Sequence, residues 1–118
     1  MPQVTVEYSA VLREAFDRRA FALALHEEGA AVVGGQVEAF KSRFYRIDDG
    51  VIAGGDAREA MVHAAVAILP GREEEVRRRL AQVVVELLGR HVRPVAGIRV
   101  QLTAEVRELE VYHKVVLE

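Results

Sequence analysis

The chain contains no cysteine, which excludes disulfide bonds, zinc–thiolate sites and catalysis by a thiol. No apolar run approaches the roughly 20 residues that span a bilayer, so a membrane is not an expected partner. The first residues, Met-Pro-Gln-Val-Thr-Val-Glu-Tyr, lack the basic and apolar regions of a signal peptide. We therefore expect a cytoplasmic protein.

An excess of positive charge is also missing. The 16 lysines and arginines stand against 18 acidic residues, for a net charge of −2. A nucleic-acid-binding protein normally shows a basic field, so nucleic acid is not an expected partner either. Lysine is rare and occurs only as Lys41 and Lys114. The many arginines suit contacts with carboxylates, although a biased genome explains their number equally well and is the explanation we favour.

The length of 118 residues suits one domain over residues 1–118, and a composition of 51% hydrophobic and 29% charged residues suits a packed core. A chain this short leaves much of its surface exposed after folding. Self-association would bury further apolar area, so an oligomer is expected from size alone.

Several segments have the patterns of β-strands. Residues 3–9 and 98–107 alternate between apolar and polar side chains, which is typical of strands with one buried face. Residues 58–69 are apolar on both faces, which indicates a central strand covered on both sides. Residues 37–47 are expected to be extended, and residues 111–117 could add a short final strand.

Two segments are predicted to be helical. The first begins after Asp17, a suitable N-cap, and runs to residue 29 or 33 before Gly34-Gly35. The second runs from Glu73 to His91, with a solvated face on which Glu73, Glu74 and Glu75 each precede an arginine by four residues. The expected apolar stripes are Phe16, Ala20, Leu23 and Ala24 in the first helix, and Val76, Leu80, Val83, Val84, Leu87 and Leu88 in the second.

The expected order is strand, helix, strand, strand, helix, strand, and the fold class is α+β. Two β-α-β units form a four-stranded sheet with both helices on one face. The other face then needs a cover. Because residues 60–69 are apolar on both sides, we expect other subunits to provide it.

Pro2 is the first candidate for chemistry. Proline is small enough for the aminopeptidase that removes an initiator methionine, and removal would leave a secondary amine at the start of a strand. An α-amino group titrates near pH 8, and apolar surroundings or cations lower that value, so the amine could act as a general base near neutral pH. The Met-Pro pair alone is weak evidence for this use.

The flanking residues are more specific. Pro2-Gln3-Val4-Thr5-Val6-Glu7-Tyr8-Ser9, followed by Leu12-Arg13-Glu14, resembles the N-terminus of 5-carboxymethyl-2-hydroxymuconate isomerases, in the tautomerase superfamily. Lys41-Ser42-Arg43 lies where that family carries Arg-Ser-Arg, and Val62-His63 and Gly71-Arg72 also match. The resemblance covers residues 2–108 at low identity and excludes the tail.

The resemblance implies a tautomerase-like homotrimer with active sites around its N-terminal prolines. Pro2 would be the base that moves a proton on a dienol with several carboxylates, a ring-cleavage product in aromatic catabolism, without a metal or other cofactor. Arg72 would bind a substrate carboxylate. Lys41 stands where the family has a second substrate-binding arginine, and a lysine cannot bind a carboxylate through two parallel hydrogen bonds as an arginine does. Arg43, on the same strand face, could take over that role.

Simpler interpretations remain for these residues. Arg72 could pair with Glu74 or Glu75, and Lys41 could be solvated. His63, among apolar neighbours, is more easily explained as a hydrogen-bonded core histidine than as a catalytic one. The other histidines, His26, His91 and His113, lack the spacing of metal ligands.

Two alternative functions also stay open. One is a non-catalytic ferredoxin-like binding or assembly domain that dimerises through its sheet. The other is a tautomerase-superfamily member with a different proline-based reaction, such as hydrolytic dehalogenation, which the lysine at position 41 keeps possible.

Overall fold

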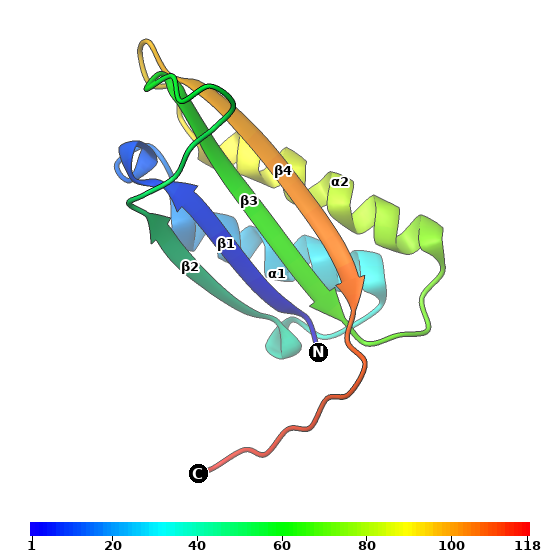
Figure 1. Ribbon diagram of the computed structural model, residues 1–118. Helices are drawn as coiled ribbons and strands as arrows, with labels where there is room; N and C mark the ends of the chain where they lie inside the picture. The colour runs from blue at the N-terminus through cyan, green and yellow to red at the C-terminus, as the bar shows by residue number, and fades with distance from the viewer.

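The computed structural model describes residues 1–118 as a four-stranded mixed sheet with two long helices on one face (Figure 1). The element order and the α+β class predicted from sequence are therefore confirmed. Neither helix combines the length and apolar composition that crossing a membrane requires. The elements are β1 (Gln3–Ser9), a 3-10 turn (Ala10–Leu12), α1 (Arg18–Val33), a 3-10 turn (Val37–Ala39), β2 (Lys41–Ile47), β3 (Glu59–Ile68), α2 (Glu74–His91) and β4 (Arg99–Glu108).

The strands lie in the order β2-β1-β3-β4. β1 pairs in parallel with β2, β3 pairs in parallel with β4, and the two central strands β1 and β3 are antiparallel. The two parallel strands of each β-α-β unit are therefore direct neighbours in the sheet. A ferredoxin-like domain places another strand between the parallel strands of each unit. The ferredoxin-like fold expected under that alternative is therefore wrong.

This topology gathers four strand ends at one edge of the sheet. β1 and β2 begin there, and β3 and β4 end there, so both chain termini leave from the same edge (Figure 1). We call it the N-terminal edge. Residues distant in sequence meet along it, because Gln3 pairs with both Lys41 and Ala67, and Ala67 pairs with Arg107.

The core lies between the sheet and the helices. Alternate residues of β1 and β3 point to the helices and are fully buried, as the period of a strand requires. The predicted stripe of α2 is confirmed, with Val76 only partly buried. The side chains with no exposed surface include Val4, Val6, Phe21, Leu25, Val62, Ala64, Val66, Leu80, Val84 and Leu88.

The stripe predicted for α1 is wrong in part. Phe21, Leu25 and Val33 are buried, whereas Leu23 is 53% exposed. Residues 20–25 are all apolar, so their periodicity could not indicate which face packs on the sheet. The helix ends were predicted correctly, because the Asp17 side chain accepts a hydrogen bond from the Ala20 N–H at 3.1 Å and Gly34 ends the helix at φ +67°.

The solvated face predicted for α2 is confirmed, but it holds fewer ion pairs than its spacing allows. Only Arg78 reaches the glutamate four residues before it, Glu74, at 3.5 Å. Both side chains are exposed, so water screens the pair and its contribution to stability is small.

The face of the sheet opposite the helices has no cover within the chain, and we call it the open face. Its side chains form cross-strand rows of mixed character. Thr5 of β1 lies between Arg43 and Ala65, and Glu7 lies between Tyr45 and His63. Many of these side chains are half-buried rather than fully exposed.

The short strand that residues 111–117 could have added is absent. Pairing stops after the Leu109 N–H, which donates to the Ile68 carbonyl at 2.7 Å. β3 ends at Ile68 and the chain turns away at Pro70-Gly71, so no strand remains beside the tail. The tail continues in irregular conformation from the end of β4 past the N-terminus (Figure 1).

The corrected stripe of α1 can be tested with a matched pair of leucine substitutions. Leu25→Ala should lower the free energy of unfolding by about 2–5 kcal/mol, because it opens a cavity in the core. Leu23→Ala should cost roughly 0.5 kcal/mol, because its side chain already meets water. Urea unfolding at one protein concentration measures both, and equal losses would contradict the packing described here.

Candidate active site

Pro2 is buried and immediately precedes the central strand β1. Its carbonyl accepts a hydrogen bond from the Lys41 N–H at 3.1 Å, which continues the pairing of β1 with β2 by one residue. With β2 on one side and β3 on the other, the start of the chain cannot move away from the N-terminal edge without breaking sheet pairing.

Arg72 reaches the same edge from the turn after β3. Gly71 supplies the positive φ of +115° that this turn needs, and Arg72 follows it directly. The guanidinium donates from Nε to the Val33 carbonyl at 3.2 Å and from Nη1 to the Leu69 carbonyl at 3.4 Å. Arg72 makes neither of the ion pairs considered from sequence, with Glu74 or Glu75, and is held by backbone carbonyls instead.

Lys41 and Arg43 lie on the same face of β2, as predicted, and that face is the open face of the sheet. The Lys41 ammonium donates to the Ala39 carbonyl at 2.8 Å. The Arg43 guanidinium donates from Nη2 to Oε1 of Gln3 at 2.6 Å, across the pairing of β2 with β1. Arg43 lies two residues further along β2 than Lys41, so it is farther from the N-terminal edge.

The electrostatics of this edge act on the N-terminal amine. Burial lowers the pKa of the Met1 amine most, and the positive charges of Arg72, Lys41 and Lys114 lower it further. Since Pro2 is the next residue along the chain, an amine at Pro2 would meet the same cations. Pro2, Lys41 and the turn that carries Arg72 therefore lie along the same edge of the sheet within a single chain.

Lys114 is a further positive charge that lowers the pKa of the N-terminal amine, and sequence reasoning did not consider it. The resemblance to the family ended at residue 108, so the tail carried no expectation of function. The parallel pairing of β4 with β3 was the available signal, because it makes the tail leave the sheet where the chain begins.

His63 is hydrogen-bonded, as expected, but the prediction that it lies in the core is wrong. It lies on the open face, with Nδ1 at 2.7 Å from Thr103 Oγ1 and Nε2 at 2.7 Å from Glu105 Oε2. Nowhere in the chain do three or more His, Asp or Glu side chains gather as metal ligands would.

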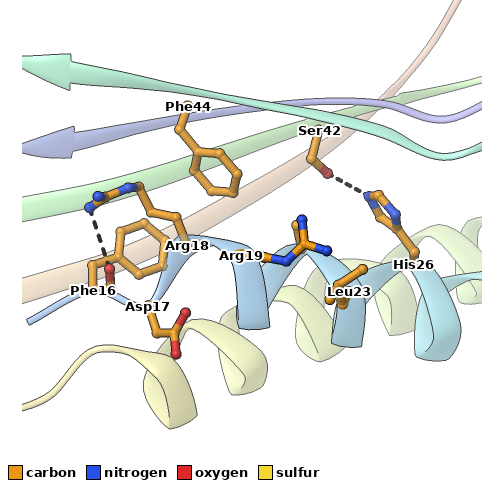
Figure 2. A pocket seen from close by; sticks show the side chains of 9 residues that line it. Phe16, Asp17, Arg18, Arg19, Leu23, His26, Ser42 and Phe44 are labelled. Atoms are coloured by element: carbon orange, nitrogen blue, oxygen red, sulfur yellow. Dashed lines mark hydrogen bonds between the residues drawn. The ribbon is translucent and has the colours of Figure 1, made fainter.

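A surface hollow of about 560 Å³ lies between α1 and β2 (Figure 2). Pro2, Arg72 and Lys41 are not among the residues that line this hollow. The Arg18 guanidinium at its rim is already engaged, because it donates to the Phe16 carbonyl at 3.4 Å and lies 4.9 Å from the Tyr8 ring centroid. Inside, His26 Nε2 lies 2.8 Å from Ser42 Oγ, and burial lowers the pKa of His26. Its lining residues are Phe16, Asp17, Arg18, Arg19, Ala22, Leu23, His26, Ser42 and Phe44.

Solved structures with the same fold are numerous. A 5-carboxymethyl-2-hydroxymuconate isomerase from Deinococcus radiodurans R1 has a TM-score of 0.80 at 24% identity, over 96% of this chain and 88% of that one. A 5-carboxymethyl-2-hydroxymuconate delta-isomerase has a TM-score of 0.81 at 20% identity, over 100% and 89%. A fused 4-OT described as a wild-type symmetric trimer has a TM-score of 0.72 at 16% identity, over 91% and 85%.

Comparison with curated protein sequences finds no match. The sequence model of one family, by contrast, matches residues 2–115, nearly the whole length. The match includes the tail that the resemblance from sequence left out. On this evidence the chain belongs to the 5-carboxymethyl-2-hydroxymuconate isomerase family of the tautomerase superfamily.

Proposed function

We propose that the protein isomerises a small unsaturated hydroxy or oxo acid of the 5-carboxymethyl-2-hydroxymuconate type, in aromatic catabolism, with Pro2 as general base. The observation that carries this proposal is the position of Pro2, buried at the start of β1 with its carbonyl bonded to the Lys41 N–H at 3.1 Å, where burial and the charges of Arg72 and Lys41 lower the pKa of the N-terminal amine. An amine with a lowered pKa is more often the free base at neutral pH, which is the form that accepts a proton.

In the proposed reaction, removal of Met1 exposes the secondary amine of Pro2. The amine takes the hydroxyl proton of the dienol as the C=O bond forms, and the ammonium group returns a proton to a carbon of the dienol. Atoms balance without any co-reactant, and the base is regenerated. Cations near the carbonyl oxygen stabilise the negative charge that develops on it.

Arg72 and Lys41 are the proposed carboxylate-binding residues. Two backbone carbonyls hold the Arg72 guanidinium and leave Nη2 without a partner in the chain, so a carboxylate can bind there with a charge-assisted hydrogen bond. Lys41 supplies a point charge instead of the planar fork of an arginine. Arg43 is a second candidate on the same face, although Gln3 already holds it.

A homotrimer is the proposed assembly. The side chains of the open face are mostly half-buried, those of Ala65 and Ala67 on the central strand β3 are small and apolar, and no helix or loop covers this face. Copies of the same chain that pack against this face would cover it and would enclose the N-terminal edge, which lies in no deep hollow of its own. The symmetric trimer reported for the fused 4-OT of the same fold supports this arrangement.

The lysine at position 41 favours one second candidate function, a different proline-based reaction. A lysine where the family has an arginine changes the geometry of carboxylate binding, and a different proline-based reaction could suit it. A screen with muconate-type and halo-acrylate substrates separates the two, because only the leading candidate predicts turnover of 5-carboxymethyl-2-hydroxymuconate.

Replacing the proposed base should abolish most activity. Pro2→Ala should reduce kcat at least about 100-fold, because general-base catalysis contributes that much. One additional residue left ahead of Pro2 should have the same effect, since the amine becomes an amide. Light scattering should give the same trimer mass for all forms, and mass spectrometry should show that Met1 is absent from the active protein. Undiminished turnover by either altered form would exclude Pro2 as the base.

Removing the guanidinium of Arg72 should weaken substrate binding. Arg72→Ala should raise KM for 5-carboxymethyl-2-hydroxymuconate about 10- to 100-fold, because a hydrogen bond between charged groups contributes about 1.5–3 kcal/mol. Arg78→Ala is the matched control, since Arg78 faces solvent on α2 and pairs only with Glu74. Steady-state kinetics measure both, and equal KM values for the two variants would contradict the assignment.

A further inference from the structure

We infer that the hollow between α1 and β2 binds a hydroxyaromatic carboxylate, with Arg19 on the carboxylate and the pair of His26 and Ser42 on the hydroxyl. Its volume of about 560 Å³ falls in the range of small-molecule sites. None of the residues assigned to the proposed reaction lines it, so this site stands or falls independently of that reaction.

One wall of the hollow is a stripe along α1. Arg19, Ala22, Leu23 and His26 follow the i, i+3, i+4, i+7 spacing that places side chains on one side of a helix. Leu23, in the middle of the stripe, is 53% exposed although it is a large apolar side chain. The stripe therefore has an apolar middle, with a cation at one end and an imidazole at the other.

The opposite wall comes from β2. Ser42 and Phe44 alternate with the residues of the open face, so they point to the helix side of the sheet (Figure 2). The Phe44 ring meets the ring of Phe16 edge-on, with 5.8 Å between their centroids. Two aromatic rings and the exposed Leu23 give the hollow walls against which a flat ring can pack.

The end of the hollow at Arg19 is positively charged. Arg19 takes part in none of the chain's seven ion pairs. Figure 2 shows no hydrogen bond between Arg19 and the other lining residues. Asp17 is the one acidic residue of the lining, and its carboxylate already accepts the Ala20 N–H at 3.1 Å. A ligand carboxylate can therefore bind Arg19 through a charge-assisted hydrogen bond.

The other end of the hollow is polar but neutral. Nε2 of His26 lies 2.8 Å from Oγ of Ser42, and burial lowers the pKa of His26, so its ring is uncharged at neutral pH. A neutral imidazole has one donor and one acceptor nitrogen, and a serine hydroxyl both donates and accepts. This pair suits a hydroxyl group of the ligand and offers no charge to a second carboxylate.

The distance between the two ends sets the size of the ligand. Arg19 and His26 are seven residues apart, which is about 10.5 Å along the helix axis. A benzene ring with a carboxylate and a hydroxyl at opposite positions has about this reach once a hydrogen bond of roughly 2.8 Å is added at each end. The probe with this shape is 4-hydroxybenzoate.

An NMR titration of the full chain with 4-hydroxybenzoate tests the site. Resonances of Ala22, Leu23 and Ser42 should shift and saturate, with a Kd below about 1 mM. Arg19→Gln should raise this Kd at least about tenfold, the lower end of the range for a charged hydrogen bond. Arg78→Gln is the matched control, because it removes an exposed positive charge from α2, and it should change the Kd less than about twofold.

Two analogues test the two ends of the ligand separately. Benzoate lacks the hydroxyl and 4-hydroxybenzamide lacks the charge, so each should bind about fivefold or more weakly than 4-hydroxybenzoate. Ser42→Ala should abolish the preference for 4-hydroxybenzoate over benzoate and leave the Kd of benzoate within about twofold.

Three results would overturn the inference. Equal affinities for the acid and the amide, or an unchanged Kd in Arg19→Gln, would remove the role of Arg19. Shifts confined to the surroundings of Pro2 and Arg72 would place the acid at the proposed active site instead. A hollow covered by another copy of the chain would show no shift with any probe. Turnover by wild-type protein and by Pro2→Ala tests the proposed reaction and bears on none of these results.

Discussion

β1 pairs in parallel with β2 and antiparallel with β3, and this central position determines what surrounds the start of the chain. The parallel pairing brings the beginning of β2 and Lys41 beside Pro2. The antiparallel pairing brings the end of β3, and with it the Arg72 turn. Burial of Val4 and Val6 beneath the two helices holds β1 in this register, because a shift by one residue would turn both side chains out of the core. The site is thus a consequence of sheet pairing.

Positive charges gathered at one edge raise the electrostatic energy of the folded chain, and the structure limits that effect in two ways. The Arg72 guanidinium binds the carbonyl of Val33, the last residue of α1, where the helix dipole is negative. The Lys41 ammonium binds the Ala39 carbonyl and stays in contact with water. Neither cation forms an ion pair within the chain, so under the proposed function both can bind a carboxylate. A carboxylate that binds only the folded protein would in turn stabilise it.

Element order and most boundaries could be predicted because strands 3–9 and 98–107 and the second helix have clear periodicity. The face of α1 that packs on the sheet could not be predicted, because residues 20–25 are all apolar and give no periodicity. Only packing against the sheet determines that Phe21 and Leu25 are the buried side chains. The proposed site residues Pro2, Lys41 and Arg72 were selected from the resemblance to a family. The contact of Tyr112 with Gln3 could not be predicted, because it joins residues 109 positions apart and one of them lies in an irregular tail.

The central claim is that the fold places a free Pro2 amine in surroundings that favour its neutral form. Titration of ¹⁵N-proline-labelled protein, with Met1 removed, by NMR measures the pKa of this amine directly. We predict a pKa below the ordinary value of a proline amine at the start of an unstructured peptide, and a higher pKa after Arg72→Ala because one of the neighbouring positive charges is lost. A pKa at or above the ordinary value, unmoved by Arg72→Ala, would contradict the account.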